Sequence, residues 1–376
     1  MNPEQQLSDA LGSRGKAYDP APIGFEEVTR RAGRIRRRRL TASIAATGLG
    51  LAGVVGIATT WNAPTGGQQI PPVATGSVHP TPFIDTVGPL SLSSVKRGAA
   101  PHVAYLFDGR VYSPGDIDEP LPNPRGVTSF GTYHGGWVTV RNNELVTQFD
   151  ADGAVVRSGP GSGLSTDADG ARHGFAINGT LYVGSPMAEG ETAIALRSGS
   201  VFKGFVSGSR WIEERDGKTF LVSSDGNKHT RMPMLAPVRA TSSTGDLYVG
   251  SGFDSVQVSS IDGSTKWEST AWIPESFSPD GTLVAALSPS EGLAKVARVA
   301  ILDAKTGQRL AYFRLTEHSL ELAGMPRWED NSHILFGAKQ LGNSQVALLR
   351  LGVDKSLVRA TKVLDATHRQ GFVISD

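Results

Sequence analysis

The chain has 376 residues, of which 39% are hydrophobic, and its formal net charge at pH 7 is +1. That length allows one large domain or two ordinary ones, and the complete absence of cysteine excludes disulfides, thiol catalysis and cysteine metal sites. Residues 1–39 hold nine Lys and Arg against five Asp and Glu, which leaves the rest of the chain with a net charge of about −3. A mildly acidic main part argues against nucleic acid as a ligand.

Positive charge is concentrated in the first 39 residues, which are polar, interrupted by glycine and proline, and end in an arginine run. The run consists of Arg34, Arg36, Arg37, Arg38 and Arg39. Because positive charge stays on the cytoplasmic side of a membrane, the run predicts a cytoplasmic tail that contacts anionic lipid headgroups.

Residues 40–61 follow as a charge-free run of apolar and small side chains. As a helix the run would be roughly 33 Å long, and the hydrocarbon core of a bilayer is about 30 Å thick. We therefore predict a transmembrane signal anchor with its N-terminus in the cytoplasm, and Trp61 fits the outer membrane interface. Two alternatives stay open, namely a cleaved signal peptide and a buried helix of a soluble domain.

One face of this segment carries small residues at intervals of four: Gly48, Ala52 and Gly56. Small residues at that spacing let two spanning helices approach closely, so this face is a candidate helix-dimer interface.

The tail resembles the juxtamembrane tails of actinobacterial single-pass membrane proteins, some of which are anti-sigma factors. The matching pieces are Leu7–Leu11 (LSDAL), a proline-containing linker at Asp19–Pro22 and the stretch Phe25–Arg39. The resemblance implies binding of a cytoplasmic sigma factor. The zinc-type anti-sigma signature needs His and Cys, and residues 1–60 contain neither.

Residues 62–81 are rich in proline and glycine and show no apolar periodicity, which predicts a semi-extended linker. From 82 to 376, short stretches of β-branched and aromatic residues alternate with Asp-Gly, Asn-Gly and Gly-Ser turns. This pattern predicts hairpin-linked strands and an all-β extracytoplasmic domain. The glycine-rich stretch Gly159–Gly163 is interpreted as a loop between strands.

A turn-plus-strand unit of the form x-G-x-L-x-V recurs at Gly179, Gly245 and Gly281. Division of residues 82–376 by a unit of about 40–45 residues gives about seven units. Four-stranded units that repeat at a fixed period and are arranged radially form a β-propeller. We therefore predict about seven blades, with six or eight as alternatives.

The sharpest unit is Phe277–Ser288 (FSPDGTLVAALS), followed by Val299–Leu310 (VAILDAKTGQRL). It resembles a WD40 or TolB-type blade, whose hallmarks are F-S-P-D-G in one hairpin and D-x-x-T-G in a later one. The Gly-His and Trp-Asp pairs of true WD40 repeats are missing, so the resemblance is to a degenerate relative. It implies a fold rather than an activity.

Two pairs of acids are calcium candidates, because carboxylates two residues apart begin a calcium loop. They are Asp150 with Asp152 and Asp167 with Asp169. Neither pair continues to a third acid and a terminal Glu, and the alternative interpretation is an ordinary Asp-Gly turn. The sequence shows no G-x-S-x-G, no H-E-x-x-H and no histidine pair at metal-ligand spacing, so we predict no catalytic residue and no cofactor.

The leading hypothesis is a membrane-anchored, extracytoplasmic propeller that acts as a non-catalytic binding or sensing module for an extracellular protein or glycan. One alternative is a propeller hydrolase or lyase that acts on carbohydrate or lactone, which predicts acids and histidines at one channel mouth. Another is transmembrane signalling, in which residues 1–39 bind a sigma factor.

Overall fold

The computed structural model describes residues 89–114, 117–167, 170, 172–185, 190–233, 237–251, 255–290, 293–366 and 371–375. All of them belong to one compact unit, His79–Asp376. The predicted tail, anchor and linker lie outside the described residues, so the arginine run, Trp61 and the helix-dimer face stay predictions. In the described part, none of the helices has the length and apolar character needed to cross a membrane.

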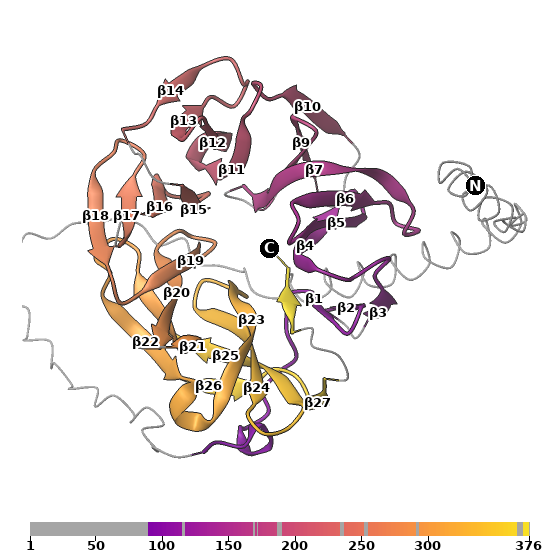
Figure 1. Ribbon diagram of the computed structural model, residues 1–376, viewed down its shortest axis with the longest axis vertical. Coiled ribbons are helices and arrows are strands. Elements are labelled where there is room, and N and C mark those ends of the chain that lie inside the picture. The colour runs from indigo at the N-terminus through magenta and orange to yellow at the C-terminus, as the bar shows by residue number, and fades with distance from the viewer. Residues whose placement is uncertain are drawn as a thin grey trace, which may run out of the picture. The chain divides into compact units, whose positions relative to one another are not determined.

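The described residues form 28 β-strands and three short 3₁₀ helices, and the strands are grouped into four-stranded antiparallel meanders that we call blades 1 to 7 (Figure 1). Blade 1 contains β28 (Val373–Ile374), β1 (Tyr105–Phe107), β2 (Arg110–Ser113) and β3 (Ile117–Pro120). Blade 2 contains β4 (Val127–Tyr133), β5 (Gly136–Arg141), β6 (Leu145–Phe149) and the first half of β7 (Val155–Thr166). Blade 3 contains the second half of β7, β8 (His173–Ile177), β9 (Thr180–Gly184) and β10 (Glu191–Ala195). Blade 4 contains β11 (Val201–Val206), β12 (Arg210–Arg215), β13 (Lys218–Val222) and β14 (His229–Arg231).

The remaining blades follow in chain order. Blade 5 contains β15 (Val238–Thr241), β16 (Leu247–Ser251), β17 (Val256–Ser260) and β18 (Thr265–Ser269). Blade 6 contains β19 (Ile273–Phe277), β20 (Leu283–Ser290), β21 (Leu293–Asp303) and β22 (Arg309–Arg314). Blade 7 contains β23 (Leu320–Trp328), β24 (His333–Gln340), β25 (Gln345–Gly352) and β26 (Leu357–Arg359), with β27 (Leu364–Asp365) also paired to β25. The 3₁₀ helices are η1 (Leu92–Ser94), η2 (Ser207–Ser209) and η3 (Thr316–His318).

The first strand of each blade lies innermost, and these strands form a closed ring. In order around the ring they are β28, β4, β7, β11, β15, β19 and β23; each packs against the next, and β23 returns to β28. The sheets are arranged around a common centre, where the C-terminal strand lies (Figure 1). Meanders repeated around a central channel define a β-propeller, which confirms the predicted all-β fold class.

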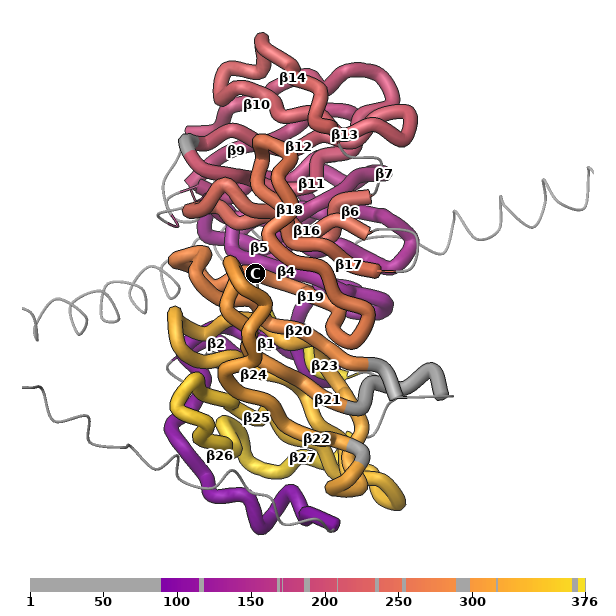
Figure 2. Tube along the Cα trace, turned by 90° about the vertical axis from the view of Figure 1, so that its left-hand side faces the viewer, coloured from indigo at the N-terminus to yellow at the C-terminus, as the bar shows by residue number. Residues whose placement is uncertain are grey.

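Both ends of the described chain cross the join between blades 7 and 1. The C-terminal strand β28 supplies the innermost strand of blade 1 and pairs with β1 through Tyr105 and Ile374. The segment before β1 runs along the outer edge of blade 7, where Arg97 forms a parallel bridge with Arg359 (Figure 2). The ring is therefore held shut at its innermost strand and at its outer edge.

The apolar core lies between neighbouring sheets. The largest cluster joins blade 6 to blade 7, where Ile301 and Phe313 pack near Phe336 and Leu349, all at most 3% exposed. Strands β24 and β25 are buried over most of their length on both faces. Their sequences accordingly are continuous apolar runs rather than alternating patterns.

Turn chemistry explains many of the hairpins. Four two-residue turns have positive φ at both central residues, the type I′ geometry that fits the twist of paired strands. They are Asp108-Gly109, His134-Gly135, Asn178-Gly179 and Asp216-Gly217. The prediction that Asp-Gly and Asn-Gly dipeptides join strands is confirmed at Asp108-Gly109, Asn178-Gly179 and Asp216-Gly217.

The interpretation of Gly159–Gly163 as a loop is wrong, because these residues lie inside the twelve-residue strand β7. Val155–Pro160 pairs with β6, and the chain continues at Gly161 as the partner of β8. A Cβ at Gly161 would lie 2.0 Å from the carbonyl oxygen of Ala176. Glycine at this position therefore allows β7 and β8 to approach closely and is not a sign of a flexible loop.

Candidate functional site: a charged central channel and an apolar seam pocket

The innermost strands of blades 2 to 7 each contain at least one β-bulge in their pairing with the second strand. A bulge inserts one extra residue that is left out of the hydrogen-bonded ladder, and this can redirect its side chain. From blade 2 to blade 7 the extra residues are Thr128, Gly163, Lys203, Arg239, Glu275 and, at the first of two bulges in β23, Ala323. All six line one of two cavities.

The first cavity is the central channel, of about 660 Å³. Its wall includes residues from six of the seven innermost strands and one residue just after the seventh, β28: Ser129 (β4), Ser165 (β7), Lys203 (β11), Arg239 (β15), Glu275 (β19), Arg327 (β23) and Ser375. Its size falls in the usual range of small-ligand sites, about 300–1,000 Å³. Because the propeller converges here, a ligand would contact several blades at once.

The channel holds an excess of positive charge. The Lys203 ammonium lies 3.1 Å from a carboxylate oxygen of Glu214, so this pair is neutral overall. The guanidinium groups of Arg239 and Arg327 also line the channel and interact electrostatically with the carboxylate of Glu275. With Lys203, Arg239 and Arg327 against Asp167 and Glu275, the lining side chains carry a formal charge of +1.

Two opposing effects act on the pKa of the Glu275 carboxyl group. Burial raises the pKa of its carboxyl group, and the nearby guanidinium groups of Arg239 and Arg327 partly counteract this effect. Arg239 is exposed, and its Nε donates to Ser251 Oγ at 2.8 Å. Guanidinium groups have the planar donor geometry that suits carboxylates and phosphates. The channel is therefore chemically suited to an anion.

One mouth of the channel contains an acid and a histidine, the types expected for a hydrolase. Both carboxylate oxygens of Asp167 accept hydrogen bonds from Arg172, each at 2.9 Å. His173 Nδ1 lies 2.7 Å from the carbonyl oxygen of Thr132. Asp167 therefore has both of its carboxylate oxygens engaged, and the Nδ1 contact of His173 fixes the orientation of its imidazole ring.

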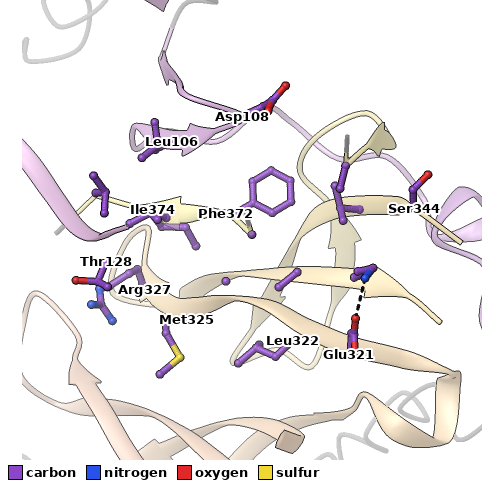
Figure 3. Close-up of a pocket in the computed structure, with 18 of the residues that line it drawn as sticks. Leu106, Asp108, Thr128, Glu321, Leu322, Met325, Arg327, Ser344, Phe372 and Ile374 are labelled. Atoms are coloured by element: carbon purple, nitrogen blue, oxygen red, sulfur yellow. Dashed lines mark ion pairs between the residues drawn. The ribbon is translucent and has the colours of Figure 1, made fainter. Parts of the chain in front are cut away.

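The second cavity, which we call the seam pocket, lies between blades 7 and 1 and has a volume of about 820 Å³ (Figure 3). Its wall is mainly apolar: Leu106, Val127, Leu322, Met325, Phe372 and Ile374 are among its lining residues. The ion pair between Lys339 Nζ and Glu321 Oε1, at 3.2 Å, lies along one side. Arg327 lines both this pocket and the channel.

The seam pocket exists because blade 1 has a very short innermost strand. β28 spans two residues, whereas the innermost strands of the other blades are longer. The neighbouring β23 has two bulges, and its Ala323 carbonyl accepts the Phe372 amide instead of a ladder partner. A Cβ at Gly371 would lie 2.0 Å from that carbonyl oxygen, so only glycine permits this approach. The short pairing of β28 on one side and the bulges of β23 on the other leave the seam pocket open.

Three of the four predicted calcium residues lie in the described part of the chain, in the turns at the two ends of β7. Asp150 Oδ1 accepts the amides of Asp152 and Ala154, at 2.9 and 2.8 Å, in the turn before β7. Asp167 lies in the turn after β7, and Asp169 is outside the described residues. Over the described ranges, no three His, Asp or Glu side chains cluster in a way that could hold a metal ion. Calcium binding by these pairs stays a prediction.

Sequence reasoning missed the channel residues. Lys203, Arg239 and Glu275 follow one another at intervals of 36 residues. Each interrupts a short apolar strand three or four residues before a turn that begins with serine. A search for charged residues at a fixed period would have found them.

Comparisons with known proteins add little beyond the architecture. No family model matches the chain, and no curated protein matches it. Similar solved structures include the β-propeller domain of Cps50 (Swd1) from Myceliophteria thermophila, with TM-score 0.42, 10% identity and coverage of 64% of this chain and 86% of that one. A putative TolB from Agrobacterium tumefaciens has TM-score 0.40, 14% identity and coverage of 58% and 88%. Hsv2p from Kluyveromyces lactis has TM-score 0.41, 12% identity and coverage of 71% and 100%. The fold assignment rests on the strand order and ring of innermost strands of this chain.

Proposed function

We propose that this protein is a membrane-anchored, extracytoplasmic binding module whose propeller takes a small anionic ligand in its central channel. The observation that carries the proposal is the charge arrangement of blades 5, 6 and 7. There, Arg239, Arg327 and the half-buried Glu275 line one ligand-sized cavity, and both guanidinium groups interact electrostatically with the Glu275 carboxyl group.

The hydrogen-bond partners of Asp167 and His173 support binding of a ligand rather than its chemical conversion. Both carboxylate oxygens of Asp167 are engaged by Arg172, and the contact of His173 Nδ1 with a backbone carbonyl fixes the orientation of its ring, which suits both residues to structural roles in the channel wall. Glu275 remains as a half-buried acid that interacts electrostatically with Arg239 and Arg327, which suits it to orient guanidinium groups and to adjust the charge of the channel.

The membrane part of the proposal rests on the sequence. The arginine run before residue 40 and the charge-free segment 40–61 support an anchor with a cytoplasmic tail. Protease treatment of intact cells tests it: we expect digestion of the propeller and protection of an epitope at residue 1. Protection of both parts, or release of the propeller in soluble form, would contradict the anchor. Contact of the tail with a sigma factor is a separate proposal, which capture by the isolated 1–39 peptide tests.

Anion binding is tested by calorimetric titration of the full chain in lipid nanodiscs with acetate, inorganic phosphate and sulfate, with glycerol as a neutral comparison. We expect the anions to bind and glycerol not to bind. Arg239→Gln and Arg327→Gln should each weaken binding at least tenfold, because a charged hydrogen bond contributes about 1.5–3 kcal/mol.

The matched control is Arg309→Gln, which removes a guanidinium that stacks on Tyr312 in β22 and does not line either cavity. Equal weakening by this variant would show a nonspecific charge effect. Absence of binding by all three anions would overturn the proposed function.

A further inference from the structure

The seam pocket and the channel adjoin each other along three strands. On β23, Arg327 lines both cavities. On β4, Thr128 lines the seam pocket and the next residue, Ser129, lines the channel. At the C-terminus, Ile374 lines the seam pocket and Ser375 lines the channel. Arg327 therefore borders a charged space and an apolar space.

The two spaces differ sharply in chemistry. The channel wall carries Lys203, Arg239 and Glu275, whereas the seam pocket is walled largely by aliphatic and aromatic side chains. Met325 is 46% exposed, which makes it one of the few large apolar side chains of the described residues that is not covered. Met325 is one of the residues that line the pocket, and its flexible thioether can adapt to an apolar ligand.

We propose that the seam pocket takes the alkyl chain of a single-chain amphiphile, whose carboxylate or phosphate head is held at Arg327 and Arg239 in the channel. This inference rests on the proposed function and names the ligand class. A single chain fits because the pocket follows β23 from Glu321 to Arg327, a path of roughly 20 Å at about 3.3 Å per residue.

An alkyl chain suits this pocket better than a peptide strand does. A peptide needs partners for its own amides and carbonyls. Along the bulged part of β23, the Ala323 carbonyl is already taken by the Phe372 amide. An alkyl chain needs only apolar contact, which Leu322, Met325 and Phe372 supply.

The test uses the full chain in lipid nanodiscs with ¹³C-methyl-labelled methionine. The sequence contains five methionines, of which Met325 lines the seam pocket and Met232 is 2% exposed in another core cluster. Probes are acetate, octanoate, decanoate, dodecanoate and dodecyl phosphate below their micelle-forming concentrations, with dodecyltrimethylammonium as the head-group control. The Met325→Leu variant assigns the signal, and empty nanodiscs measure partition into lipid.

We expect dodecanoate and dodecyl phosphate to shift the Met325 methyl signal and leave Met232 in place. Affinity should rise with chain length, with an upper limit of about fourfold per added methylene. The cationic amphiphile should not bind, and Met325→Glu should remove most of the gain from decanoate to dodecanoate. Preference for the carboxylate or for the phosphate head identifies which form of the ligand class is recognised.

Two failures are distinguishable. If acetate and phosphate bind the channel but lengthening the chain brings no gain and no Met325 shift, the seam-pocket inference is overturned and the proposed function survives. If no anion of any length binds, the proposed function itself fails. Equal shifts by the cationic amphiphile would show unspecific apolar binding and would also overturn the inference.

Discussion

A buried ion pair fastens the segment before β1 to blade 7. Arg350 on β25 donates from Nε and Nη2 to both carboxylate oxygens of Glu329, with the Nη2 contact at 2.7 Å. Its terminal nitrogens also donate to the carbonyls of Ala99 and Ala100, each at 3.1 Å. The His102 amide donates to Glu329 Oε1 at 2.6 Å. The side chains of Arg350 and Glu329 are 10% and 1% exposed.

Breaking this pair should destabilise the propeller strongly. Arg350→Met removes both hydrogen bonds to Glu329 and both to the backbone carbonyls, and it leaves a buried carboxylate with only the His102 amide. Loss of one partner of a buried pair costs about 3–5 kcal/mol. Glu329→Gln should cost less than this, because Gln keeps one acceptor. The double variant should be less destabilised than the sum of the singles by about 1–3 kcal/mol.

The assay is urea unfolding of the full chain followed by tryptophan fluorescence, since Trp328 is adjacent to Glu329. Arg210→Met is the matched control, because its pair with Asp246 is substantially exposed and should contribute at most about 1 kcal/mol. Two results would refute the reasoning. One is a loss of under about 1 kcal/mol for Arg350→Met, and the other is strict additivity in the double variant.

Three further predictions concern the seam, the channel and the turns. The Phe372 ring is buried and stacks on Phe107 with the ring centroids 4.6 Å apart. Phe372→Ala should therefore lower the free energy of unfolding by about 3–5 kcal/mol. A urea midpoint equal to that of the wild type would contradict the view that this ring packs in the core between blades 7 and 1. Because burial raises the pKa of Glu275, its negative charge is lost on acidification at a higher pH than is usual for a glutamate. Calorimetric sulfate affinity should therefore begin to rise at that higher pH as the solution is acidified, and Glu275→Gln should remove this rise. Hydrogen bonds from the Ser223 hydroxyl and the Asn227 amide lower the pKa of Asp225 to about 2. The ionised Asp225 therefore stabilises the folded state above pH 4, and this contribution is lost as pH falls through 2. Asp225→Ala should lower the urea midpoint at pH 5 and have little effect on it at pH 2.

The fold class could be predicted from the turn residues in the sequence. The position of each repeat unit within its blade could not. Asp108-Gly109 and Asn178-Gly179 form tight hairpins because Asp, Asn and Gly tolerate positive φ. The recurring x-G-x-L-x-V unit, however, falls at different places in the blades. Gly179 precedes a third strand, whereas Gly245 and Gly281 precede second strands. The same turn-plus-strand pattern suits the hairpin before a second strand and the hairpin before a third strand. It therefore indicates that a strand follows, but not which strand of the blade it is.

The candidate site was harder to predict because it depends on pairing across the ring. Whether Arg239 or its neighbour is the extra residue of a bulge is decided by the register against β16, which no local pattern encodes. The seam pocket depends on Tyr105 pairing with Ile374, two residues at opposite ends of the domain. Only the regular spacing of Lys203, Arg239 and Glu275 was present in the sequence itself.

The shared strand β7 has a consequence for how the ring opens. Because one uninterrupted strand is hydrogen-bonded to β6 in its first half and to β8 in its second, blades 2 and 3 form a single seven-stranded sheet. Separation of blades 3 to 7 from one another need not break any ladder, whereas separation of blade 2 from blade 3 strains the ladders on both sides of β7. Amide hydrogen exchange should therefore show blades 2 and 3 opening together as one cooperative unit, with protection that does not fall at their boundary.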